Sequence, residues 1–165
     1  MPRSLLLAPV LALLAFLTVT LGASAQDDPA SVLQRFQDAR NLGDVDGAMA
    51  LVAPDLSYSG GPACPPASPC IGTAALRRDV QLFIADQVYS SSIVSPDVSG
   101  TTVHARLASQ SPSRSAIGLE RTLSDLTAEV RDGQIISWRS GDDATDPQTA
   151  WWLDHQPVPS PELAR

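Results

Sequence analysis

The hydrophobic pattern of this chain changes its period once, near residue 88, and that change constrains the fold more than any other feature of the sequence. Before this point apolar residues recur at helical spacing, and beyond it they alternate with polar residues, as in strands that bury one face. Helices followed by strands are typical of α+β folds, in which helices cover one face of an antiparallel sheet. We therefore predict an α+β roll in which three N-terminal helices pack on a curved antiparallel sheet.

Three helices are expected before the change of period, each with a capping residue in front of it. Their expected spans are residues 28–40, 44–52 and 73–88. Asp28 precedes Pro29 at the start of the first helix and Gly43 follows its end, which are the positions that these residue types favour. Pro54 is expected to stop the second helix. Asp79 is expected to lie away from the apolar stripe of the third.

Four longer strands are expected after the helices, with a short one inside the helical region. The expected strands are residues 55–59, 89–98, 101–110, 117–131 and 134–141. Short connections between consecutive strands predict an antiparallel meander, and Asp132-Gly133 predicts a tight hairpin between the last two. Pro147 is expected to begin a short helix that carries Trp151 and Trp152. We expect residues 153–165 to be a disordered, proline-rich tail.

The first 25 residues have the layout of a secretory signal peptide. Arg3 supplies the positive charge, residues 5–21 are apolar, and Ala23-Ser24-Ala25 resembles a cleavage site. We expect the mature chain to begin at Gln26 and to be secreted or to reside in the cell envelope. An uncleaved membrane anchor is the alternative, because the apolar run is close to the roughly 20 residues that a span needs.

The charge of the chain excludes several classes of function. Its net charge is −7, whereas binding to nucleic acid requires a basic surface, as does binding to anionic membranes. The sequence contains no lysine, which excludes Schiff-base chemistry and a phosphate-loop lysine. We expect no nucleic-acid partner, no membrane association after signal cleavage, and no cofactor, because the motifs of common cofactor sites are missing.

Two groups of residues have the chemistry of metal ligands, but neither has the spacing, and no metal is expected. Cys64 and Cys70 are the only two cysteines, and His104 and His155 do not lie at zinc-finger spacing from them. In an exported chain we expect the cysteines to form a disulfide that rigidifies a rim. The acidic run at residues 142–146 lacks the ligand spacing of a calcium loop and is expected to be a solvated face.

Three motifs carry a resemblance to a known family. They are the helix pair with a Gly43-Asp44 turn, the G-x-x-A-L-R start of the third helix at 72–77, and the D-G-x-I-x-x-W hairpin at 132–138. With them the sequence resembles the nuclear transport factor 2 superfamily, specifically its SnoaL-like branch, over a domain at residues 26–152. The resemblance implies a cone: a strongly curved sheet wraps three helices and leaves a cavity at its open end. Its members include isomerases, cyclases, hydrolases, dimeric interaction modules and ligand binders, so the fold alone does not determine a function.

The resemblance also implies a carboxylate inside the cone, with a pKa that apolar walls raise so that it can move a proton at neutral pH. The candidate catalytic residues are Asp125, Glu120 and His104, and the candidate pocket residues are Tyr58, Phe83, Arg121 and Trp138. Alternation along the strands puts Asp125 and His104 opposite the apolar face, unless a bulge reverses the parity. The first helix has Phe36 where a ketosteroid isomerase would use a tyrosine as oxyanion donor.

Three hypotheses about function remain open. In the first, the chain is an exported domain that binds a small apolar or amphipathic molecule in its cone without catalysis. In the second, it is an isomerase, cyclase or hydrolase with Asp125 or Glu120 as base, assisted by His104 or Arg121. In the third, it is an interaction module that forms a homodimer through the outer sheet face. The missing tyrosine, together with the lack of an acid–base pair on one face, favours the first.

Overall fold

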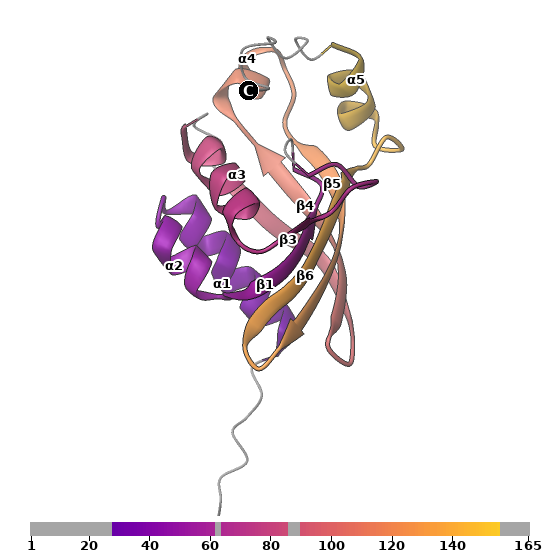
Figure 1. The fold of residues 1–165 in the computed structure, drawn as a ribbon. Helices are drawn as coiled ribbons and strands as arrows, with labels where there is room; N and C mark the ends of the chain where they lie inside the picture. The colour runs from indigo at the N-terminus through magenta and orange to yellow at the C-terminus, as the bar shows by residue number, and fades with distance from the viewer. Residues whose placement is uncertain (1–27, 62–63, 86–89, 156–165) are drawn as a thin grey trace, which may run out of the picture.

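A computed structural model describes residues 28–61, 64–85 and 90–155 of the chain (Figure 1). A six-stranded sheet in the order β2-β1-β6-β5-β4-β3 curves around three helices, which confirms the predicted α+β class. The helices are α1 (Pro29–Asn41), α2 (Val45–Ala50), α3 (Ala74–Ala85), α4 (Pro112–Ala116) and α5 (Pro147–His155). The strands are β1 (Val52–Ser59), β2 (Cys70–Ile71), β3 (Ser90–Ser99), β4 (Thr102–Gln110), β5 (Thr122–Arg131) and β6 (Gln134–Asp142).

Some of the predictions concern parts of the chain that the structure does not describe. The leader, Val88 and residues 156–165 of the expected tail lie outside the described residues. Within the described ranges, no helix has the length and apolar character needed to cross a membrane.

The first two helices begin at the predicted capping residues. The Asp28 carboxylate accepts a hydrogen bond from the N–H of Ser31 at 3.1 Å, and that of Asp44 accepts one from Gly47 at 2.8 Å. Each bond satisfies a donor that the first turn of a helix leaves unpaired. Gly43 joins the helices with a φ of 76°, a left-handed conformation that glycine adopts without strain. This turn packs α2 beside α1.

Strand β1 is longer than the sequence predicted. Helix α2 ends at Ala50, and β1 begins at Val52 with Pro54 inside it, so the expectation that Pro54 stops a helix at residue 52 was wrong. The register between β1 and β6 shifts between Val52 and Ser57. A proline removes one donor from a ladder and is tolerated where the ladder is already irregular.

The sheet contains the predicted antiparallel meander from β3 to β6. Asp132 and Gly133, with φ of 50° and 75°, form the predicted hairpin turn between β5 and β6. A parallel pairing of β1 with β6 was not predicted. It places Tyr58 of β1 opposite Trp138 of β6.

Two further boundaries differ from the predictions. The expected strand at 117–131 is shorter, because Ser111 caps helix α4 through the N–H of Arg114 at 3.3 Å, and β5 begins only at Thr122. Helix α5 begins at Pro147 as predicted but continues past residue 152. There the ring of His155 stacks on Trp151 with centroids 4.1 Å apart, so the expected tail is helical up to this residue.

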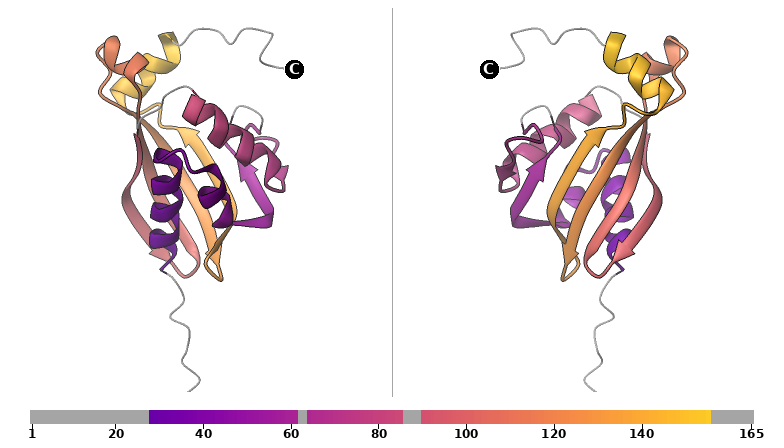
Figure 2. Two further views of the ribbon diagram at one scale, coloured as in Figure 1. Left: turned by 90° about the vertical axis from the view of Figure 1, so that its left-hand side faces the viewer. Right: turned by 90° about the vertical axis from the view of Figure 1, so that its right-hand side faces the viewer.

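The hydrophobic core lies between helices α1 to α3 and the concave face of the sheet (Figure 2). Leu126, Ala128 and Val130 of β5 are buried there, as their alternation predicted. Phe36 of α1 packs against Trp138 with 5.4 Å between the ring centroids. This contact places the inner face of α1 against the middle of the sheet.

The end of α1 is fastened to the edge strand β3. The Asn41 side chain donates a hydrogen bond to the carbonyl of Ser91 and accepts one from its N–H, both at 2.9 Å. The amide thereby satisfies two backbone groups of a strand at the edge of the sheet. Helix α1 is thus fixed to the sheet through Phe36 in its middle and through Asn41 at its C-terminal end.

Candidate functional site

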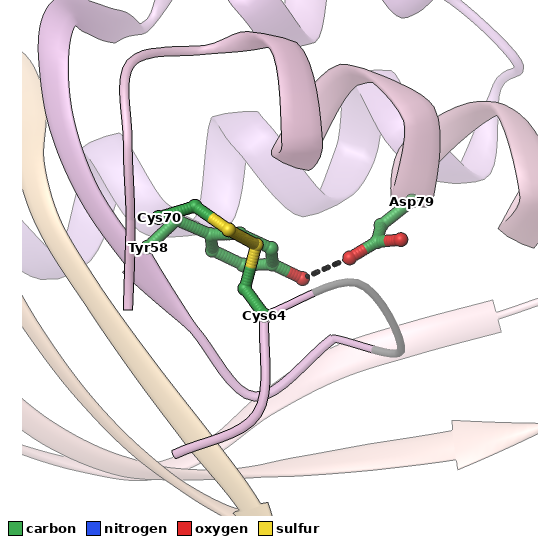
Figure 3. Close-up of a disulfide and its surroundings, with 4 residues drawn as sticks. All are labelled: Tyr58, Cys64, Cys70 and Asp79. Carbon is green, nitrogen blue, oxygen red and sulfur yellow. Dashed lines mark hydrogen bonds between the residues drawn. A yellow bond between two sulfur atoms is a disulfide. The ribbon is translucent and has the colours of Figure 1, made fainter. Parts of the chain in front are cut away.

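The predicted disulfide between Cys64 and Cys70 is present at the end of β1 (Figure 3). Cys64 is fully buried, and Cys70 pairs with Tyr58 across β2 and β1. The N–H of Gly60 donates to the carbonyl of Cys64 at 2.7 Å, and the N–H of Cys64 donates to that of Gly61 at 3.1 Å. The disulfide therefore fixes the glycine turn that follows β1.

Next to this turn, the Tyr58 hydroxyl donates a hydrogen bond of 2.7 Å to the Asp79 carboxylate (Figure 3). Tyr58 is only 4% exposed, whereas Asp79, on α3, is half-buried. The bond ties α3 to β1. The expectation that Asp79 lies away from the apolar stripe was wrong, since it follows the buried Leu76 by three residues and so borders the same helix face.

The backbone of Gly61 covers this pair closely. A Cβ atom at position 61 would overlap both Oδ2 of Asp79 and the hydroxyl oxygen of Tyr58. Only glycine leaves room for the hydrogen bond and for the turn at the same time. The turn and the disulfide thus form one wall of the site.

Burial controls the protonation of both partners. It raises the pKa of the Asp79 carboxyl, and this effect exceeds the lowering by the Tyr58 hydrogen bond and by the charge of Arg78. Burial, followed by the hydrogen bond to Asp79, also raises the pKa of Tyr58. The phenol therefore keeps its proton and remains the donor. The other carboxylate oxygen of Asp79, Oδ1, has no hydrogen-bond partner among the described residues.

Two polar side chains of α1 complete the site. The Arg40 guanidinium lies over the Phe83 ring, 3.7 Å from its centroid, and burial lowers the pKa of Arg40 to about 10. Tyr58 is coupled electrostatically to both Arg40 and Asp79. Gln37 is fully buried, and neither of its amide atoms has a partner in the part of the chain that is described; the same holds for Nε of Arg40.

Gln37, Arg40, Tyr58 and Asp79 are named here the polar cluster. Aromatic rings of Phe36, Phe83 and Trp138 pack beside it. The cluster combines a cation, a carboxyl group that can take up a proton, and unpaired donors and acceptors. Such a set can bind a polar group, and it can transfer a proton. Among the described residues, no three His, Cys, Asp or Glu side chains come together as a metal site.

Comparison with known proteins identifies the fold. No protein-family model matches the sequence, and no curated protein matches it either. Solved structures do match. A nuclear transport factor 2-like protein of unknown function from Cytophaga hutchinsonii aligns over 74% of this chain and 96% of its own, with a TM-score of 0.54 and 12% identity. This chain has a nuclear transport factor 2-like fold.

Two further structures with this fold have names that mention a reaction. IdmH from Streptomyces antibioticus, a candidate polyketide cyclase, aligns over 77% of this chain and 99% of its own, with a TM-score of 0.57 and 20% identity. An epoxide hydrolase from M. tuberculosis aligns over 80% and 96%, with a TM-score of 0.52 and 22% identity. These matches confirm the fold that the sequence motifs predicted. At such identities they establish the fold and not a reaction.

Three of the residues chosen from sequence as pocket residues lie in or next to the polar cluster. Tyr58 belongs to the polar cluster, and Phe83 and Trp138 pack beside it. Sequence reasoning missed Gln37, Arg40 and Asp79. The sequence feature that could have identified them is their position and not their residue type. Each lies three or four residues from an apolar residue that faces the core.

The remaining candidates lie on the surface. Asp125 and His104 are exposed on the outer face of the sheet, where strand alternation put them. Glu120 and Arg121 are exposed before β5, and their backbone N–H groups bond to Gln148 of α5. None of these four side chains reaches the polar cluster, because no bulge within β5 turns its outer positions inward before residue 129.

The expectation of a solvated acidic face was wrong for Asp143. Its side chain is buried, accepts a hydrogen bond from the N–H of Thr145 at 3.0 Å, and lies 3.3 Å from Arg106. Hydrogen bonds from Thr145 lower the pKa of Asp143. Arg106 also approaches Asp125 at 3.7 Å. These residues hold the end of β6 in place.

A shallow groove of about 210 Å³ lies elsewhere, between the N-terminus of α1 and β3. It is lined by Asp28, Ala30, Ser31, Gln34, Ile93 and Pro96. None of them belongs to the polar cluster, and three of them, Asp28, Ala30 and Ser31, are the cap and first turn of α1. The unpaired buried groups make the polar cluster, rather than this groove, the candidate site.

We predict that Gly61→Ala destabilises the protein by about 1–3 kcal/mol, as is usual when atoms are forced into a packed site. Gly141→Ala is the control, since a Cβ there meets no atom within 4 Å. Urea unfolding measures both. In a Tyr58→Phe/Asp79→Ala background the cost of Gly61→Ala should shrink, and an unchanged cost would show that the collision is not with this pair.

A second prediction concerns pH. The folded state holds the Asp79 proton to higher pH than the unfolded state, so this carboxyl contributes stability below its ordinary pKa and loses that contribution as pH rises through the folded pKa. The free energy of unfolding of the wild type, measured relative to Asp79→Asn, should therefore fall as pH rises from 3 to 7. Asp55→Asn, which removes an exposed carboxylate of β1, controls for the loss of charge. A constant or rising difference would contradict the assignment.

Proposed function

We propose that this chain is an exported nuclear transport factor 2-like domain that binds a small apolar or amphipathic molecule in its cone. The observation that carries the proposal is the set of unpaired buried atoms in the polar cluster. Gln37, Arg40 and Asp79 together leave two donors and two acceptors without partners among the described residues. Native interiors leave few such atoms unpaired.

The free-energy cost of leaving these atoms unpaired supports the presence of a bound ligand. An unsatisfied buried polar group costs about 1–3 kcal/mol, and apolar side chains of similar shape would avoid that cost. Side chains that break the rules of core packing concentrate at functional sites. A bound molecule with its own donors and acceptors would pair them, while its apolar part would lie against the partly buried ring of Phe83.

Arg40, Asp79 and Phe83 are only partly buried, whereas Gln37 and Tyr58 are buried. The polar cluster therefore extends from partly exposed side chains to the fully buried amide of Gln37. The disulfide supports the export part of the proposal, because such bonds persist in oxidising compartments. The signal peptide remains a prediction from the sequence.

The first test is to purify the chain from an exporting host and to measure bound mass by native mass spectrometry. We expect one small molecule per chain, and its loss in Gln37→Leu, which replaces the unpaired amide by an apolar side chain. Arg139→Gln on the exposed side of β6 is the control and should keep the molecule. An empty wild type that also fails to bind a panel of amphipathic molecules would overturn the proposal.

A second candidate function is proton transfer with Asp79 as general base. The raised pKa of this carboxyl inside the cone favours it. The Tyr58 hydroxyl would hold one carboxylate oxygen while Oδ1 accepts a proton from a carbon acid. The molecule released from the wild type, returned to the protein in deuterated water, should then gain deuterium with the wild type and not with Asp79→Asn. Equal exchange with both proteins would leave binding as the function.

A further inference from the structure

Among the described residues, the Arg40 guanidinium is a partly buried cation without an anionic partner. The ion pairs of the described residues do not include it, and its Nε has no acceptor there. Its contact with the Phe83 ring fixes the guanidinium plane but leaves its charge uncompensated. A desolvated charge of this kind is stabilised chiefly by an opposite charge with hydrogen-bonding geometry.

Gln37 lies on the same face of α1, three residues before Arg40, so the two side chains are neighbours on the helix surface. Its amide is fully buried, with an unpaired donor and an unpaired acceptor. The amide nitrogen of Gln37 and the guanidinium of Arg40 thus offer donors on one side of the polar cluster. The Asp79 carboxyl lies on α3 and accepts the hydrogen bond of Tyr58, which also interacts electrostatically with Arg40.

We propose that the molecule bound in the cone is a carboxylic acid with an apolar body, and that Arg40 and Gln37 bind its carboxylate. This inference rests on the proposed function and names its ligand class. The planar guanidinium suits a carboxylate, which accepts two parallel hydrogen bonds. The apolar body would lie against the partly buried ring of Phe83, over which the Arg40 guanidinium also lies.

Other ligand classes fit the charges less well. A neutral amphiphile would leave the guanidinium charge uncompensated. A phosphate monoester carries about −1.5 to −2 charges at pH 7, and the described part of the cluster offers one cation beside an acidic Asp79. A cationic ligand would pair with Asp79 but would lie near the unbalanced charge of Arg40. A monocarboxylate compensates Arg40 with one charge.

Substitution of Arg40 also distinguishes a role of this residue in ligand binding from a role in the stability of the fold. If the guanidinium is retained for a ligand, Arg40→Met removes a buried, uncompensated charge and keeps the apolar stem, so the empty protein should be at least as stable as the wild type. If Arg40 serves only the fold, for example through its contact with Phe83, the same variant should be less stable. Denaturant unfolding without ligand distinguishes the two.

The binding experiment uses two probes of nearly the same shape, 2-naphthylacetate and 2-naphthylacetamide, titrated into the full exported chain by calorimetry. We expect the acid to bind at least 10-fold more tightly than the amide. Arg40→Met should remove this preference by weakening the acid and not the amide, and Arg40→Lys should restore it in part. Arg139→Gln, which removes a positive charge elsewhere, should leave the preference unchanged.

Each outcome decides between the two proposals. Equal binding of acid and amide, or a preference that survives in Arg40→Met, overturns the carboxylate assignment and leaves the proposed function standing. If neither probe binds but native mass spectrometry shows a bound molecule that is not an acid, the carboxylate assignment is likewise overturned and the proposed function stands. Absence of binding by both probes and of any bound molecule overturns both proposals. A clear loss of stability in Arg40→Met that accompanies unchanged binding assigns Arg40 to the fold.

Discussion

The packing of α1 into the concave face of the sheet is the constraint on which the rest of this structure depends. A curved sheet leaves an apolar hollow that one helix must fill, and the contact of Phe36 with Trp138 lies at its centre. The hydrogen bonds of Asn41 to Ser91 fasten the same helix to the sheet edge. Because α1 is held in this way, the side chains on its inner face have little freedom to turn toward solvent. Gln37 is therefore buried because of its position on this helix, although glutamine side chains are usually exposed.

The polar cluster is assembled by elements that are otherwise unrelated in the sequence. α1 brings Gln37 and Arg40, β1 brings Tyr58, and α3 brings Asp79. The disulfide and the glycine turn hold the β1 side of this arrangement from outside. A site whose supporting wall is covalently closed keeps its geometry even when its own polar groups repel or lack partners. This explains how unpaired groups persist in a small domain.

Much of the fold was predictable from local signals. Capping by Asp28 and Asp44, the Asp132-Gly133 hairpin and the disulfide depend on short-range chemistry and were found as predicted. The site was not predictable in the same way. Asp79 and Tyr58 are 21 residues apart, and their contact depends on the packing of α3 against α1 and α2, which no local pattern encodes. Candidates were instead sought on the late strands, where alternation already placed Asp125 outside.

The parallel pairing of β1 with β6 has a consequence for the order in which the site forms. The hairpin of β5 and β6 joins neighbours in the chain, whereas Tyr58 meets Trp138 only after most of the domain has been looped out between them. Closing a long loop is entropically costly, so such non-local contacts tend to be made late in folding. Tyr58 belongs to the polar cluster, so we expect the cluster to be completed late in folding. A ligand of the proposed kind would then bind only chains in which β1 has paired with β6, and the bound ligand would report that step.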